Sequence, residues 1–329
     1  MVFLKFRSKL NKLAFVWLGL LVFGTVAQAE YPDKPILFVA PFAAGGANDY
    51  LTRLMAQHMG NELRTSIVVD NKTGANGIVG ASFVAKAAPD GYTLLMGNSA
   101  THGTNPSLYP NMPFDPINDF APVSMVGSVP LVIAVDPRLG INSIAELISY
   151  GKKNPGKLAF GSSGIGGTGH LAGEAFNAAA HLDMVHAPYK GDAPAVGDVA
   201  AGQVPIAVIG VASASPLLAA GRIKVLAVAS DHRAVAMPDV PTLAEVGFPG
   251  LEFAQWYALF TRAGTPAATI TKLNLAAKHT LERAEVKQAM LTQGAEARYL
   301  TSEQLAEFSK SEIKRFSDIV SRLNIKADQ

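Results

Sequence analysis

Four stretches of the sequence combine glycine with small polar side chains, and each follows a short apolar run that is typical of a strand. They are residues 41–49, 98–105, 161–170 and 187–192. Glycine lets a backbone approach a ligand closely, and free N–H groups at the start of a helix favour an anion such as a carboxylate. The stretch at 41–49 therefore predicts an anion-binding turn, although a capped turn without a ligand explains its residues equally well.

The stretch at 161–170 resembles a dinucleotide-binding fingerprint only in part. Three of its glycines match the G-x-G-x-x-G spacing, but the acidic residue expected about 20 positions further on is absent. The hydroxyl groups of Ser162, Ser163 and Thr168 instead add donors to the backbone N–H groups of the turn. We therefore expect an anion-binding turn here and no nicotinamide cofactor.

The other two stretches offer polar groups that would orient a ligand. Residues 98–105 are dense in small hydrogen-bonding side chains that carry no charge. In the stretch at 187–192, Tyr189 would line a cleft with its ring, and Lys190 would either steer an anion or lie at the surface as an ordinary lysine. These turns are placed where ligands bind in open parallel sheets, at the carboxyl ends of the strands.

Catalytic and metal-binding patterns are missing from the sequence. It contains neither G-x-S-x-G nor H-E-x-x-H, and its seven histidines show no metal-ligand spacing. The chain has no cysteine, which excludes thiol catalysis, thiolate metal sites and disulfide bonds. We therefore expect no catalytic residue, no metal and no cofactor.

The first 29 residues have the three parts of a secretory signal peptide. Four cationic side chains precede an apolar run at 13–23, and the small-residue pattern Ala-x-Ala ends at Ala29. The run is too short to span a bilayer, so cleavage after Ala29 is favoured over an uncleaved anchor. Cleavage changes the net charge of the chain from +2 to −2. That balance argues against nucleic acid as a partner, and we expect a soluble, periplasmic protein.

The elements that must position these turns alternate between strand and helix. Strands at 36–40, 67–69 and 93–96 and helices at 48–59 and 77–87 give a βαβαβ pattern, which is typical of a parallel sheet. A second series follows a long loop predicted at 100–118. Its expected strands are 123–126, 130–135, 158–160, 184–186, 206–209, 225–229 and 256–261, its expected helices are 143–153, 169–180 and 193–201, and a helical tail is expected from 266 to 323.

Eight short motifs, in order along the chain, are similar to those of the Bug family, the extracytoplasmic solute receptors of tripartite tricarboxylate transporters. The resemblance begins at Tyr31 and extends to the C-terminus. The motifs are YPDKPI (31–36) with VAPFAAGG (39–46), VDNKTGANG (69–77), APDGYTL (88–94), NPSLY (105–109), FDP (114–116) with DFAPV (119–123), PYKG (188–191), PDVPT (238–242) and AGTP (263–266).

The resemblance implies a two-domain clamshell of α/β type, similar to type II periplasmic binding proteins. Residues 30–127 and 228–329 would form domain I, and residues 128–227 would form domain II. The hinge would lie near 123–135 and 225–230. The family further implies capture of a small carboxylate in the cleft between the domains, delivery to the membrane permease subunits of a tripartite tricarboxylate transporter, and a monomeric protein.

The ligand-binding residues implied by the resemblance come from the same turns. They are Phe42, Ala43, Gly46, Asn48, Asp49, Thr73, Gly74, Ser99, Thr101, Ser162, Ser163, Thr168 and Tyr189. One departure concerns Ile209, which stands where an acid facing the cleft is common in the family. Without that acid we expect a ligand that lacks a cationic amine, namely a plain di- or tricarboxylate or an aromatic acid.

Two other functions remain open from the sequence. A periplasmic hydrolase would need a nucleophile–base pair among Ser99, Ser162, Ser163 and the histidines. A ligand-sensing subunit of a membrane signalling partner would use the same ligand-driven closure as a transport receptor, so the sequence does not separate the two roles.

Overall fold

The structure, a computed structural model, describes residues 30–326, so the predicted signal peptide at 1–29 lies outside the described residues. Contacts divide the chain after Asp33, and the unit that begins at Lys34 carries every element discussed below. Among residues 30–326, none of the helices combines the length and the apolar character that crossing a membrane requires.

The first strands form the predicted parallel βαβαβ unit. Strands β1 (Ile36–Ala40), β2 (Ile67–Asn71) and β3 (Thr93–Asn98) lie in the order β2-β1-β3, and the pairings among these three are parallel. Helices α2 (Ala47–Leu63) and α3 (Ile78–Ala85) connect them, with the short turn η1 (Ala75–Gly77) before α3. The apolar run of β1 is explained by its position, because it is the central strand of the three and almost completely buried.

A single long strand replaces the two runs predicted at 123–126 and 130–135. Strand β4 (Phe120–Val135) pairs along its first part with the antiparallel strand β9 (Ala254–Arg262), which in turn pairs with β3. The prediction of two separate strands was wrong. The small residues near Gly127 suggest a turn, but the strand continues through them with irregularities in the β4–β9 register.

The second half of β4 belongs to another group of strands. The strand order continues β4-β7-β5-β6, with β8 on the other side of β4. Strands β5, β6 and β7 are mutually parallel, as the sequence predicts. The bounds of these strands are β5 (Leu158–Ser162), β6 (Met184–Pro188), β7 (Ile206–Gly210) and β8 (Lys224–Ala229).

Helices alternate with these strands, and one of them was not predicted. After the short turn η3 (Pro137–Leu139), the helices are α5 (Ile144–Lys153), α6 (Thr168–Ala179), α7 (Asp192–Ala201) and α8 (Val211–Ala219). Helix α8 gives a weak sequence signal because it is short, contains Pro216 and consists mainly of alanine and serine. Its position directly after β7 places its first turn beside the other strand-to-helix turns.

The stretch predicted as a long loop at 100–118 begins with helical structure. It contains a π-helical turn, η2 (Ala100–Thr104), and the short helix α4 (Asn105–Leu108). Pro106 misleads the prediction, because proline near the start of a helix is tolerated there.

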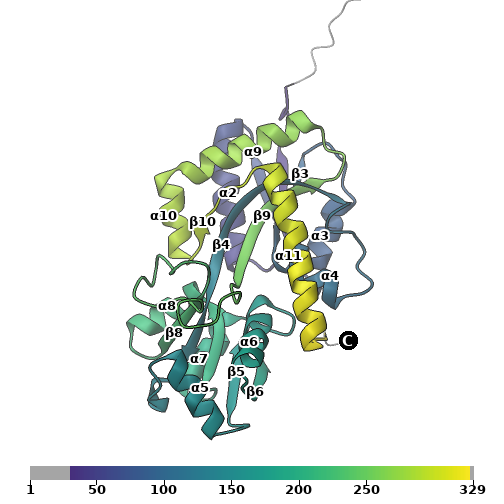
Figure 1. The fold of residues 1–329 in the computed structure, drawn as a ribbon. Helices are drawn as coiled ribbons and strands as arrows, with labels where there is room; N and C mark the ends of the chain where they lie inside the picture. The colour runs from purple at the N-terminus through teal and green to yellow at the C-terminus, as the bar shows by residue number, and fades with distance from the viewer. Residues whose placement is uncertain (1–29, 327–329) are drawn as a thin grey trace, which may run out of the picture. The chain divides into compact units, whose positions relative to one another are not determined.

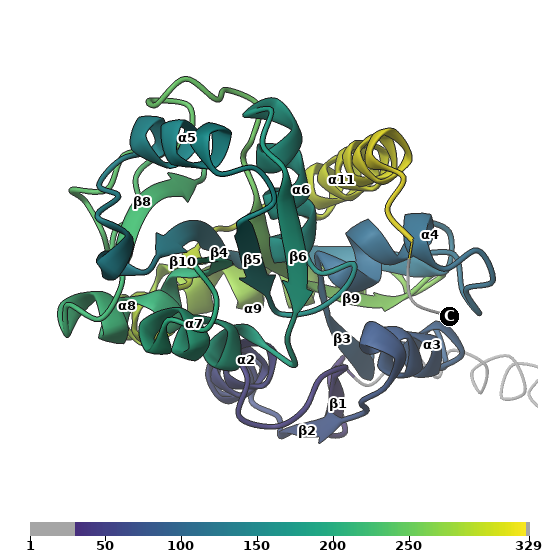
Figure 2. The same ribbon diagram turned by 90° about the horizontal axis from the view of Figure 1, so that it is seen from below.

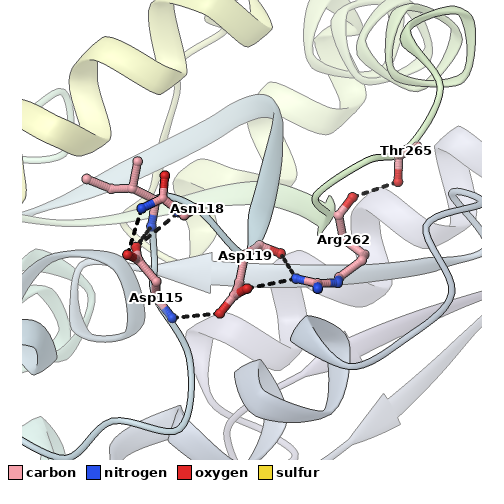
Figure 3. A network of polar contacts seen from close by, with 6 residues as sticks. Asp115, Asn118, Asp119, Arg262 and Thr265 are labelled. Carbon is pink, nitrogen blue, oxygen red and sulfur yellow. Dashed lines mark hydrogen bonds and ion pairs between the residues drawn. The ribbon is translucent and has the colours of Figure 1, made fainter.

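A polar network fixes the end of this stretch to β9 (Figure 3). The Asp119 carboxylate accepts hydrogen bonds from the Asp115 backbone N–H at 2.8 Å and from Arg262 Nη1 at 2.9 Å. The Arg262 guanidinium also donates to the Asp119 carbonyl oxygen, and the Arg262 carbonyl accepts a bond from Thr265. The network anchors the start of β4 against the strand that pairs with it.

The C-terminal tail is helical, as predicted. It contains α9 (Ala267–Glu282), α10 (Ala284–Thr292), the short strand β10 (Glu296–Ala297), which pairs with β4, and α11 (Ser302–Leu323). Helix α11 runs beside β4 and α6 (Figures 1 and 2). Its residues Phe316 and Ile319 share a buried core with Phe160 of β5. The domain boundaries given above remain a prediction.

We expect Asp119→Ala to lower the free energy of unfolding by about 1 kcal/mol, because it leaves Arg262 and the Asp115 N–H without their shared acceptor. Urea denaturation of the purified protein measures the effect. Asp318→Ala is the matched control, since that exposed carboxylate pairs with Lys314 across one helical turn, and a change within about 0.5 kcal/mol is expected there. Equal effects of the two substitutions would contradict the anchoring role.

Candidate functional site

A cavity of about 490 Å³ lies where the turns after the parallel strands meet. Its wall includes residues that follow β1, β3, β5, β6 and β7, in agreement with the expected position at the carboxyl ends of strands. The lining residues are Phe42, Gly46, Ala47, Asn48, Asn76, Asn98, Ser99, Ala100, Ser163, Gly164, Ile165, Gly167, Thr168, Lys190, Gly191, Asp192, Ala193, Ser213, Gln255 and Tyr257.

Four helices begin at this cavity. The first turns of α2, α6, α7 and α8 all contribute lining residues, and their N-cap residues are Gly46, Gly167, Gly191 and Gly210. None of the four N-caps has a side chain that accepts a hydrogen bond from the helix, unlike Ser143 before α5. The cavity therefore faces free N–H groups and the positive ends of several helix dipoles, which together favour an anion.

Glycine is required for geometric reasons at one of these N-caps and at one position in the first turn of α6. Gly191 has φ of +126°, a conformation that side chains with a Cβ rarely adopt. At Gly169, in the first turn of α6, an added Cβ would lie 2.4 Å from the carbonyl oxygen of Val208. The glycine-rich turn thus lets the start of α6 pack directly against β7, which brings both to the same cavity.

Ser99 and Thr168 link two parts of the wall. Their hydroxyl oxygens are 3.1 Å apart, and both residues are almost completely buried. Ser99 follows β3, whereas Thr168 is the first residue of α6. Residues from the first and the second βα series therefore meet at the cavity.

Two buried side-chain atoms in the wall have no hydrogen-bond partner. Asn48 is 5% exposed, and its amide nitrogen donates to the Met96 carbonyl at 3.1 Å while its Oδ1 is unpartnered. Asp192 accepts a bond at Oδ2 from the Gly210 N–H at 2.9 Å, and its Oδ1 is likewise buried and unpartnered. A buried acceptor without a donor is costly, so both atoms favour a hydrogen-bond donor in the cavity.

The position of Asp192 corrects one expectation from the sequence. The prediction of a ligand without an amine assumed that no acid remains in the cleft once Ile209 replaces the family's acid. That premise is wrong, because Asp192 lines the cavity and its carboxylate is bound to the N–H of Gly210, the residue next to Ile209. Burial raises the pKa of Asp192, and hydrogen bonds from Gly210 and Ser163 partly offset that effect.

Six of the predicted ligand-binding residues line the cavity together. They are Phe42, Gly46, Asn48, Ser99, Ser163 and Thr168. Ala43, Thr73 and Gly74 are exposed and do not belong to its wall.

The remaining predicted residues support the wall from behind. Thr101 is fully buried, and its hydroxyl lies 2.9 Å from Nδ1 of His102 and bonds to Asn98. The Tyr189 hydroxyl donates to Asp198 Oδ2 at 2.8 Å, away from the lining residues. Ser162 is also fully buried.

Asp49 holds the first turn in place. Its Oδ2 accepts bonds from the Gly45 N–H at 3.0 Å and from Arg53, and its Oδ1 accepts one from Asn71 at 2.9 Å. Burial alone would raise the pKa of Asp49, but these hydrogen bonds outweigh burial and lower it below the usual value. The carboxylate therefore shapes the turn that carries Gly46 and Asn48.

Several lining residues were missed by sequence reasoning. Asp192 lies in a stretch that was singled out, but an isolated acid in a turn gave no reason to prefer it, whereas Lys190 in the same stretch was considered as a group that steers an anion. Asn76 reaches the wall because it adopts a left-handed conformation and exchanges hydrogen bonds with Asn105. Gln255 and Tyr257 come from β9, and no local pattern marks a strand far along the chain as a neighbour of the first turns.

A larger cavity of about 690 Å³ is lined by parts of β4 and β9, by β10 and by α11. Several of its charged groups are already paired with one another: Glu312 accepts bonds from Arg315 and, at 3.0 Å, from Trp256, and His232 lies 2.6 Å from Glu296. The buried unpartnered atoms of the described residues include two in the smaller cavity and none in the larger one. The smaller cavity is therefore the candidate site.

One serine forms the kind of pair that a hydrolase would need. Ser162 Oγ lies 2.8 Å from His186 Nε2, and the ring of His186 stacks on that of His170. Burial lowers the pKa of His186 to about 4, with a further lowering by His170. Since Ser162 has no exposed surface, the pair is closed to a substrate in this conformation. Within residues 30–326, no three His, Asp or Glu side chains cluster as metal ligands.

We expect Asp49→Asn to destabilise the protein at pH 7 and to do so less at pH 3. A carboxylate whose pKa is lowered by folding contributes stability above its unfolded value of about 3.9, and this contribution is lost as the pH falls through the lower folded value. Urea midpoints at the two pH values measure the gap. For Asp183→Asn, at an exposed loop position, we expect the same urea midpoint as for the unmodified protein at both pH values. An equal loss of stability at pH 7 and pH 3 in Asp49→Asn would contradict the role given to its charge.

Comparison with known proteins assigns the chain to a family. The family described as tripartite tricarboxylate transporter family receptor matches residues 51–325. The protein BugT of Bordetella pertussis is 36% identical over 298 residues, which cover 90% of this chain and 91% of BugT. Both findings agree with the resemblance inferred from the motifs.

Two solved structures from Rhodopseudomonas palustris share the fold. Rpa4515 with adipate is 35% identical, with a TM-score of 0.81, covering 90% of this chain and 99% of that one. MatC with bound malate is 31% identical, with a TM-score of 0.76, covering 88% of this chain and 100% of that one. The predicted α/β periplasmic-binding-protein fold is thereby confirmed, and the chain belongs to the family of tripartite tricarboxylate transporter receptors, the Bug proteins.

Proposed function

We propose that the protein is a periplasmic receptor that captures a small carboxylate in the 490 Å³ cavity and delivers it to the permease subunits of a tripartite tricarboxylate transporter. The observation that carries the proposal is the meeting of four helix N-termini, each with a glycine N-cap, at one cavity. Anions bind at such termini because unpaired N–H groups and helix dipoles act together.

The binding mode follows from the groups in the wall. The only cation that lines the cavity within the described residues is the exposed Lys190. Backbone N–H groups and the hydroxyls of Ser99 and Thr168 would therefore contribute most of the free energy of binding the carboxylate. Hydrogen bonds to a charged group contribute about 1.5–3 kcal/mol each, so a few of them suffice for tight binding of a carboxylate.

The family and its relatives support the ligand class. The solved structures that the chain resembles hold adipate and malate, which are both carboxylates. Export to the periplasm rests on the signal-peptide pattern of residues 1–29 and on the family. We also propose that the protein acts as a monomer and that closure of the cleft on the ligand creates the surface read by the permease.

The test uses purified protein that has been unfolded and refolded to remove any bound molecule. A bound carboxylate raises stability by about 2.7 kcal/mol at one hundred times Kd, which calorimetric or fluorescence melting detects. Succinate, glutarate, malate and adipate are compared with the neutral amides of the same acids. At least one acid should stabilise the protein while its amide does not, and equal responses to acid and amide would contradict an anion site.

The Ser162–His186 pair is the one observation that favours a hydrolase as a second candidate. A hydrolase would lose ester turnover in Ser162→Ala while keeping ligand binding. We expect no turnover of p-nitrophenyl esters by the unmodified protein, because Ser162 is fully buried and no acid is hydrogen-bonded to His186 in the described residues. Turnover that disappears in Ser162→Ala would overturn the receptor assignment.

A further inference from the structure

We propose that the carboxyl group of Asp192 recognises a hydrogen-bond donor, an ammonium or a hydroxyl group, on the carboxylate ligand. The inference rests on the proposed receptor function and specifies the ligand class: an amino- or hydroxycarboxylate is preferred over a plain dicarboxylate. Asp192 would be a specificity-determining residue of the cavity.

The first argument is the distribution of charge among the four helix N-termini. Asp192 is the first residue of α7, and its Oδ2 accepts the N–H of Gly210, the N-cap of α8. The positive ends of α7 and α8 are thus already met by a carboxylate of the protein itself. The first turn of α2 also holds an acid, but Asp49 is paired with Arg53 and Asn71 and does not line the cavity. The first turn of α6 has no acid, so the ligand carboxylate belongs at the N-termini of α2 and α6.

The second argument is the state of the oxygen that remains. Oδ1 of Asp192 is buried and accepts no hydrogen bond, and Oδ1 of Asn48, on the wall of the same cavity, is in the same state. Both atoms are acceptors, so a donor satisfies them and a second carboxylate does not. Two unsatisfied acceptors beside an anion-binding region are complementary to a ligand that has a carboxylate at one end and a hydrogen-bond donor next to it.

The third argument concerns the protonation of Asp192. Hydrogen bonds from Gly210 and Ser163 and the helix termini favour its ionised form, whereas burial opposes that form and raises its pKa. A ligand ammonium or hydroxyl at Oδ1 would add a further hydrogen bond to the charged form. Binding of a plain dicarboxylate would instead bring two like charges together or require a proton on Asp192.

The experiment uses matched acids that differ only in the donor. Succinate, malate and aspartate form one series, and glutarate, 2-hydroxyglutarate and glutamate form the second. Binding constants are measured by isothermal titration calorimetry on refolded protein, for the unmodified chain, for Asp192→Asn and for the exposed control Asp183→Asn. Melting without ligand checks that each variant is folded.

The expected result is that at least one donor-bearing acid binds the unmodified protein and the control at least tenfold more tightly than its plain counterpart. In Asp192→Asn this preference should fall to threefold or less, because the neutral amide bound to Gly210 turns its own N–H groups toward the ligand. A loss confined to the amino acids identifies an ammonium as the donor, and a loss confined to the hydroxy acids identifies a hydroxyl group.

Three results would overturn the inference. The plain acids could bind the unmodified protein more tightly than both counterparts, which would indicate a protonated Asp192 that donates to a carboxylate. The preference for a donor could persist in Asp192→Asn, which would place the selecting group elsewhere. In either case the receptor function stands, whereas the absence of binding by all six acids and by adipate would reject the receptor function as well.

Discussion

The convergence of helix N-termini at one end of the parallel strands is the constraint on which the rest of the structure depends. The start of a helix leaves backbone N–H groups without an intrahelical partner, and glycine at all four N-caps supplies no side chain to cap them. Asp192 bonds one of the N–H groups at these helix starts, that of Gly210. The fold therefore creates an anion-binding cavity before any charged side chain is added. The charges of Lys190 and Asp192 modify the positive electrostatic potential that the helix N-termini produce in this cavity.

Long-range contacts hold these turns together. Strand β4 pairs with β9 along one half and with β7 and β8 along the other, so the two groups of parallel strands share one strand. Ser99 and Thr168 then connect a turn of the first group with a helix of the second. If the proposed receptor closes on its ligand, contacts such as the Ser99–Thr168 pair would have to form or break during that movement.

Much of the fold and part of the site could be predicted from the sequence. The parallel strands and their helices follow from short apolar runs. The family resemblance implied Phe42, Gly46, Asn48, Ser99, Ser163 and Thr168, which lie in the turns after strands where the sequence pattern also predicted ligand binding. Helix α8 was missed because alanine, serine and a proline give weak periodicity. The role of Asp192 was missed for another reason. Its carboxylate is held in the wall by a hydrogen bond from the Gly210 N–H, 18 residues away, and neighbouring residues in the sequence do not reveal that contact.

The measurement that tests the account most directly is a crystal structure of the protein with its tightest-binding carboxylate. The account predicts carboxylate oxygens within about 3 Å of the backbone N–H groups in the first turns of α2 and α6. It further predicts the donor group of the ligand beside Oδ1 of Asp192. A ligand bound in the larger cavity near Trp256 and Arg315, or a carboxylate that contacts only Lys190, would contradict the claim that the helix N-termini form the binding site.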